Sequence, residues 1–156
     1  MISKSAIQAI ARRYSHLRLN LDELARLFNA EIVYTDSINV SGSTVQNPDG
    51  SWTIVINGEE PEYRNRFTIA HEIGHLVLWS LEKNNNFSTQ QNSTYEKLAD
   101  WFAVELLMPR NEVYEAVKEK LTLQEICEFF RVSKTCAVLR LKELGFEVTP
   151  ERENIF

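Results

Sequence analysis

The feature that most constrains this chain is a helical pattern over about residues 64–81 that contains the sequence His-Glu-Ile-Gly-His at residues 71–75. Residues four positions apart in a helix lie on one face, so the imidazoles of His71 and His75 can bind a single metal ion. Glu72 lies beside them and can reach a water molecule that zinc acidifies. The alternative is a helix that carries two unrelated surface histidines. It is disfavoured because the chain has only three histidines and a glutamate directly follows His71.

A catalytic zinc site also needs a third protein ligand and an open fourth position. We expect Glu96 to supply this ligand from the next helical pattern, over about residues 94–108. Ala99 and Ala103 follow Glu96 on the same helical face, and such small residues would let the two helices approach closely. A competing interpretation stays open, because residues 93–96 (Ser-Thr-Tyr-Glu) form a capping-box pattern in which Glu96 would only cap its helix.

Asp100 is the expected neighbour of this metal site. It follows Glu96 by one helical turn, so its carboxylate is placed to accept the outer N–H of a ligating imidazole. That hydrogen bond would fix the orientation of the ring. The alternative is an ordinary solvated acid on a helix surface.

The part of the chain before the motif predicts an α+β fold, with a small antiparallel sheet packed on helices. The expected elements are helices within residues 1–21 and at 20–29, and strands at 31–35, 38–46 and 52–57. The sequence Asn-Pro-Asp-Gly at residues 47–50 predicts a turn between the last two strands. The polar residues 83–94 predict a surface loop. Residues 52–57 are our expectation for an exposed edge strand that could align a peptide by backbone pairing.

The C-terminal part of the chain predicts short helices. Residues 110–120 form one helical pattern, and residues 121–146 form a helix-turn-helix-like hairpin. We therefore divide the chain into a main domain over residues 1–120 and a helical appendage over residues 121–156. Basic residues barely outnumber acidic ones in the hairpin, so direct DNA binding is disfavoured and a role in packing or repressor recognition is favoured.

Charge and cysteine content exclude several classes of protein. The formal net charge of −5 predicts no general attraction to nucleic acid or anionic lipid. The apolar runs span only a few residues, so no membrane-spanning helix is expected. Only two cysteines, Cys127 and Cys136, are present, which favours a cytoplasmic location over a disulfide-stabilised secreted protein. They are expected to be small core residues.

Two stretches of the chain resemble the ImmA/IrrE family of zinc metallopeptidases. They are Arg-Asn-Arg-Phe-Thr-Ile-Ala-His-Glu-Ile-Gly-His at residues 64–75 and Glu-Lys-Leu-Ala-Asp-Trp-Phe-Ala-Val-Glu-Leu-Leu-Met-Pro at residues 96–109. Both occur in the family's order, and the resemblance covers about residues 20–146. It implies a zincin-like metallopeptidase fold in the main domain. It also implies peptide hydrolysis of a protein substrate, commonly a helix-turn-helix repressor of stress-response or mobile-element genes.

The resemblance also implies roles for single residues. His71, His75 and Glu96 would be the ligands of one Zn²⁺ ion per chain, and Glu72 would be the general base and acid. The residue that stabilises the oxyanion stays open, and the candidates are Tyr63, Tyr95, Arg64, Arg66 and His16.

Two other functions are compatible with the sequence. One is a non-proteolytic regulator that binds and sequesters a repressor, with zinc in a structural role only. Glu72 favours the enzyme, because a structural site needs no base beside an open metal position. The other is a DNA-binding factor, which the charge balance disfavours.

Overall fold

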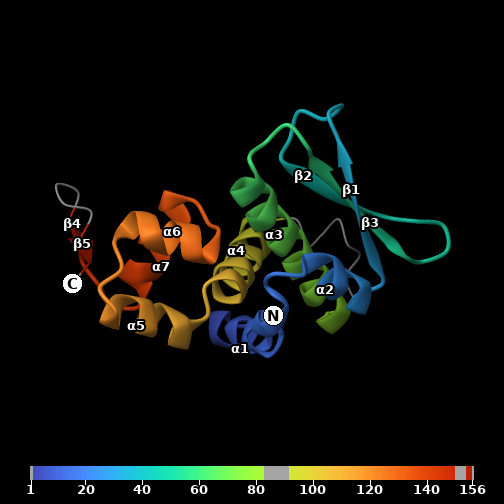
Figure 1. The fold of residues 1–156 in the computed structure, drawn as a ribbon. Helices are drawn as coiled ribbons and strands as arrows, with labels where there is room; N and C mark the ends of the chain where they lie inside the picture. Colours follow the sequence, from blue (N-terminus) through green and yellow to red (C-terminus); the bar gives the residue numbers. More distant parts are fainter. Residues whose placement is uncertain (1, 83–91, 150–153, 156) are drawn as a thin grey trace.

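The computed structural model describes residues 2–82 and 92–149 and the backbone of residues 154–155 (Figure 1). Its helices are α1 (Lys4–Tyr14), α2 (Leu21–Leu27), α3 (Glu62–Leu81), α4 (Ser93–Leu107), α5 (Arg110–Lys118), α6 (Leu123–Phe130) and α7 (Lys134–Glu143), with a 3-10 turn at Ser15–Leu17. Its strands are β1 (Ala30–Thr35), β2 (Gly42–Gln46), β3 (Trp52–Asn57), β4 (Val148–Thr149) and β5 (Asn154–Ile155). The expected α+β class is confirmed. Most of the loop expected at residues 83–94 lies outside the described residues.

The three-stranded sheet is mixed, which corrects the expectation of an antiparallel sheet. β2 pairs antiparallel with β3, but β1 pairs parallel with β3, with Ile32 opposite Ile54. The order β1-β3-β2 puts β3 in the centre. β3 is the most apolar of the three strands, and its side chains alternate between buried and partly buried positions. Burial therefore favours the central position for β3. Because β2 pairs with one side of β3, β1 pairs with the other side.

This order also corrects the expectation that residues 52–57 form an edge strand. β3 has a neighbour on both sides, so its backbone cannot accept a further strand. The edges of the sheet are β1 and β2. β2 lies next to α3, which carries the histidine motif (Figure 1).

Helices α3 and α4 form the centre of the molecule and pack closely against each other (Figure 1). Gly74, inside α3, permits this approach. A Cβ atom there would lie 3.1 Å from the Cα of Ala99 and 3.2 Å from its carbonyl oxygen. Both contacts are with the backbone of α4, which cannot rotate away as a flexible side chain could. The small residues of the two helices therefore set their separation.

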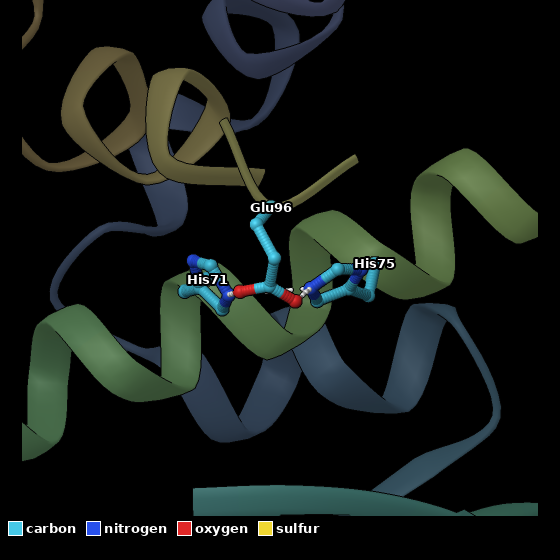
Figure 2. A group of neighbouring side chains, drawn as sticks. All are labelled: His71, His75 and Glu96. Carbon is cyan, nitrogen blue, oxygen red and sulfur yellow. Dashed lines mark hydrogen bonds and ion pairs between the residues drawn. The ribbon is translucent and has the colours of Figure 1, made fainter. Parts of the chain in front are cut away.

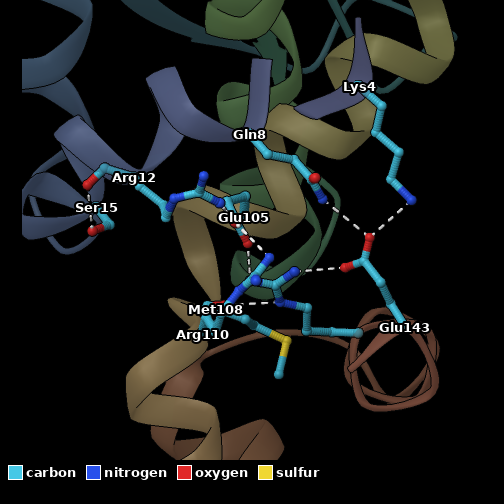
Figure 3. Close-up of polar contacts among 9 residues, drawn as sticks. Lys4, Gln8, Arg12, Ser15, Glu105, Met108, Arg110 and Glu143 are labelled. Atoms are coloured by element: carbon cyan, nitrogen blue, oxygen red, sulfur yellow. Dashed lines mark hydrogen bonds and ion pairs between the residues drawn. The ribbon is translucent and has the colours of Figure 1, made fainter. Parts of the chain in front are cut away.

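The C-terminal helices share one hydrophobic core with the rest of the chain. The buried cluster continues from Ile7 in α1 to Leu141 in α7. A buried ion pair between Glu105 of α4 and Arg140 of α7 crosses the same region, and Figure 3 shows Glu105 among its polar contacts. The domain boundary at residue 120 stays a prediction.

Two sequence-based expectations for smaller features have counterparts in the structure. Thr122 and Glu125 form a reciprocal capping box at the start of α6. Both cysteines are free thiols. Cys136 is buried in the core, which raises the pKa of its thiol to about 12, whereas Cys127 is only partly buried. None of the helices in the described part of the chain is long and apolar enough to cross a membrane.

Candidate metal centre

Helix α3 presents His71 and His75 on the face that points toward α4 (Figure 2). The Nε2 atoms of the two rings lie 3.2 Å apart. His75 is buried, with 2% of its surface exposed, whereas His71 is partly exposed. The pair therefore lies at the edge of the core, where a substrate could reach one side of it.

Glu96 comes from the first turn of α4 and points between the two imidazoles (Figure 2). Its Oε2 lies 3.0 Å from Nε2 of His71, and its Oε1 lies 2.8 Å from Nε2 of His75. The N-cap of α4 is Asn92, whose side chain accepts hydrogen bonds from the amides of Thr94 and Tyr95. Because Asn92 is the N-cap, the competing interpretation of residues 93–96 as a capping box is not the arrangement that forms.

The donor set of these three residues fits a divalent metal ion. Four ligand atoms around one zinc ion, at about 2.0–2.1 Å from it, lie roughly 3.3 Å from one another. The distances of 2.8–3.2 Å among His71, His75 and Glu96 are slightly shorter than this. Two imidazole nitrogens and a carboxylate oxygen are a donor set that several divalent metals accept, so the chemistry of the group fits a metal ion.

Asp100 contacts the far side of His71, as a partner of a ligating ring would. Its Oδ1 lies 2.8 Å from Nδ1 of His71. Burial alone would lower the pKa of His71, but the carboxylates of Asp100 and Glu96 outweigh it and raise the pKa. The contact directs the Nε2 atom of His71 toward Glu96 and His75.

The environment of His75 has the opposite effect on its charge. Burial lowers the pKa of His75, and the neighbouring His71 lowers it further. A neutral imidazole has a lone pair free for a metal, so His75 is held in the form that a ligand needs.

Glu72 lies on α3 and its carboxylate contacts the sheet. The hydroxyl of Thr44, in β2, donates a hydrogen bond of 2.6 Å to Oε2 of Glu72. Both residues are buried. This bond connects the candidate base directly to an edge strand, and the sequence analysis did not find it. No local pattern in the sequence links a threonine in a strand with a glutamate in a later helix.

Three of the five candidate oxyanion donors have other partners. Tyr95 donates its hydroxyl to Glu82, and Arg64 pairs with Glu60 at 2.9 Å. Arg66 donates from Nε to the carbonyl of Arg131. These three side chains are therefore already engaged in other polar contacts. The other two, Tyr63 and His16, are exposed, in α3 and in the 3-10 turn.

Comparison with known proteins gives a family and a fold. The family model for peptidase M78, described as an IrrE N-terminal-like domain, matches residues 25–142. No curated protein matches the chain. A solved structure of a Mycobacterium tuberculosis transcriptional regulator has a TM-score of 0.68 to this chain at 20% sequence identity. The match covers 95% of this chain and 49% of that one, so this chain spans about half of its length.

Proposed function

The chain belongs to the peptidase M78 family of IrrE N-terminal-like domains, and from this premise we propose that it is a zinc-dependent endopeptidase. The observation that carries the proposal is the convergence of His71, His75 and Glu96, with Glu72 beside them on the same helix. These three residues would hold one zinc ion per chain. A structural zinc site usually has four protein ligands, whereas three ligands leave one position for the reaction.

The roles of the residues follow from their positions. Zinc in this site would supply Lewis acidity toward a scissile carbonyl and would lower the pKa of a water molecule. Glu72 takes the proton of the attacking water and returns it to the leaving amine. Thr44 holds Oε2 of Glu72, which leaves Oε1 for the proton. Asp100 keeps the ring of His71 in the orientation that binding requires.

β2 is the strand that supports an extended substrate in this proposal. It is an edge strand, and Thr44 places it beside Glu72. An extended peptide that pairs with its free edge would run past the metal centre. On the side away from β3, β2 has no strand neighbour among the described residues, so that edge could accept a partner.

We propose a protein substrate, and a helix-turn-helix transcriptional repressor is its expected class. The family resemblance supports this class, and a chain that acts on such a repressor would regulate transcription, for example in a stress response. A cytoplasmic location follows from the same proposal, since repressors act there, and both cysteines are free.

The second candidate function is sequestration of the repressor without cleavage. It predicts that the effect of the chain survives the loss of Glu72. The buried hydrogen bond between Thr44 and Glu72 favours the enzyme instead, because a base held in a fixed orientation contributes nothing to a purely structural zinc site.

The test is co-expression with the helix-turn-helix repressor that is encoded nearest to this chain, followed by intact-mass spectrometry. Wild type, Glu72→Gln and a control with an exposed glutamate changed, Glu59→Gln, are compared. We expect one pair of repressor fragments with wild type and with the control, and none with Glu72→Gln. An intact repressor that co-purifies equally with all three proteins would establish sequestration and reject the peptidase.

A further inference from the structure

Helices α5 and α6 lie at the end of the molecule opposite the three-stranded sheet (Figure 1), and their side chains line an open apolar cavity. Its volume is about 320 Å³. Ala116 of α5, Leu121 of the connection and Phe129 of α6 form the apolar lining. Phe129 is 52% exposed, so the core does not account for this aromatic side chain. A cavity of this size would admit one bulky apolar side chain of a partner.

The exposed ring of Phe129 is held in place by its neighbours. It packs edge to face against Phe130, with the ring centroids 4.9 Å apart. The guanidinium of Arg18 lies 5.6 Å from its centroid, and the same guanidinium pairs with Glu112 at 3.0 Å. An aromatic side chain that is already fixed loses little conformational entropy when a partner binds, and such side chains dominate binding energies at interfaces.

The charged residues that line the cavity are acidic, and one of them, Glu112, already pairs with Arg18. Glu112, Glu115 and Glu119 of α5 line it, and no basic residue does so in the described part of the chain. Glu115 and Glu119 are exposed and have no ion pair among the described residues. Like charges one helical turn apart destabilise a helix slightly, so these glutamates lower the stability of α5 by a small amount.

We propose that the α5–α6 cavity is a docking site for a basic protein segment that presents one bulky apolar side chain. The apolar side chain would enter against Phe129, and lysine or arginine residues on either side of it would face Glu115 and Glu119. Charge complementarity selects this partner: an acidic segment would be repelled, and a neutral one would leave the acidic rim without partners. The proposal does not depend on the peptidase function, because it involves none of the residues of the metal centre.

The probe for the test is a fluorescein-labelled peptide in which one phenylalanine is flanked on each side by two lysines. Its binding to the full chain is followed by fluorescence anisotropy and is mapped by amide chemical shifts. We expect saturable binding that weakens as salt is added, with shifts centred on Ala116, Leu121 and Phe129. A peptide with glutamates in place of the lysines should not bind.

Variants of the chain separate docking from general attraction between charges. Glu115→Gln combined with Glu119→Gln should weaken binding about fivefold, and Phe129→Gln should weaken it about thirtyfold. The control, Glu31→Gln combined with Glu59→Gln, removes the same charge far from the cavity and should leave affinity unchanged. Circular dichroism verifies that each variant is folded.

Three results would overturn the proposal. The first is the absence of saturable binding, and the second is equal weakening by the rim and control variants. The third is occupation of the cavity by a second copy of the chain. Light scattering would reveal this second copy as a dimer, and Phe129→Gln would dissociate that dimer.

Discussion

At the scale of single residues, the candidate site depends on a few contacts that connect different elements. Glu96 and Asp100 of α4 both contact His71 of α3, one at each ring nitrogen. Thr44 of β2 contacts Glu72 from the other side. Each of these residues can be replaced by a close isostere, so the contribution of each contact can be measured separately.

Glu96→Gln tests the third ligand. The amide is nearly the same size but has no charge, so we expect zinc affinity to fall by about tenfold or more. Asp100→Asn should have a smaller effect in the same direction, because it acts only through His71. The measurement is a competition titration with a chromophoric chelator. Glu115→Gln, on the exposed side of α5, is the control. If Glu96→Gln binds zinc as tightly as wild type, Glu96 is not a ligand of the metal.

Thr44→Val tests the hydrogen bond to Glu72. Valine keeps the shape of threonine but leaves Oε2 of a buried carboxylate without its donor, which should cost about 1–3 kcal/mol of unfolding free energy. Thr44→Ser keeps the hydroxyl and should recover most of this loss. Urea denaturation in the presence of a chelator measures both values without any effect of bound metal. If the valine variant is as stable as wild type, the bond does not hold Glu72.

At the scale of elements, the separation of α3 and α4 decides whether Glu96 reaches the histidines. Gly74 faces the backbone of α4 at Ala99, and three residues before Ala99 the same helix carries Glu96. The site is therefore sensitive to a side chain that is not itself a ligand.

Gly74→Ala tests this separation. Alanine is favoured over glycine inside a helix by about 1 kcal/mol, but overpacking a close contact costs roughly 1–3 kcal/mol. We expect the free energy of unfolding to change little or to fall by about 2 kcal/mol, while zinc affinity falls clearly because α4 must move outward. Ser80→Ala, on an exposed part of α3, removes only a hydrogen bond to the carbonyl of Val77 within the same helix and should leave zinc affinity unchanged. If Gly74→Ala keeps the zinc affinity of wild type, α4 can accommodate the added methyl group without moving Glu96 away from the histidines.

The elements also show what the sequence could and could not predict. The helical pattern at 64–81 and the strand at 52–57 were predicted almost to the residue, because their periodicity is local. The antiparallel pairing of β2 with β3 was confirmed, but the direction of β1 and the edge position of residues 52–57 were wrong, since strand order depends on which strand the whole core buries most. The spacing of His71 and His75 is likewise local. The contact between Thr44 and Glu72 joins elements far apart in sequence, and no pattern within either element indicates it.

At the scale of the whole molecule, Glu105 connects helices from both ends of the chain. Its carboxylate is fully buried in α4 and contacts Arg12 of α1 at 2.6 Å, Arg110 of α5 and Arg140 of α7. Arg140 is fully buried as well, and its Nε donates to the carbonyl of Met108. Figure 3 shows how the polar groups converge on this point. The network crosses the predicted domain boundary at residue 120.

Glu105→Gln tests whether the chain unfolds as one unit. The change removes the fully buried carboxylate that pairs with Arg140 and leaves it only Glu143, which should cost about 1–3 kcal/mol of unfolding free energy. Because the network joins α1 and α4 to α7, we expect this loss in a single transition, with hydrogen exchange accelerated equally in α3 and α7. Arg140→Met in the same protein should recover part of the stability, since neither side chain of the former ion pair then carries a buried charge. If exchange accelerates in α6 and α7 alone, residues 121–156 form a separate cooperative unit and the boundary at residue 120 is real.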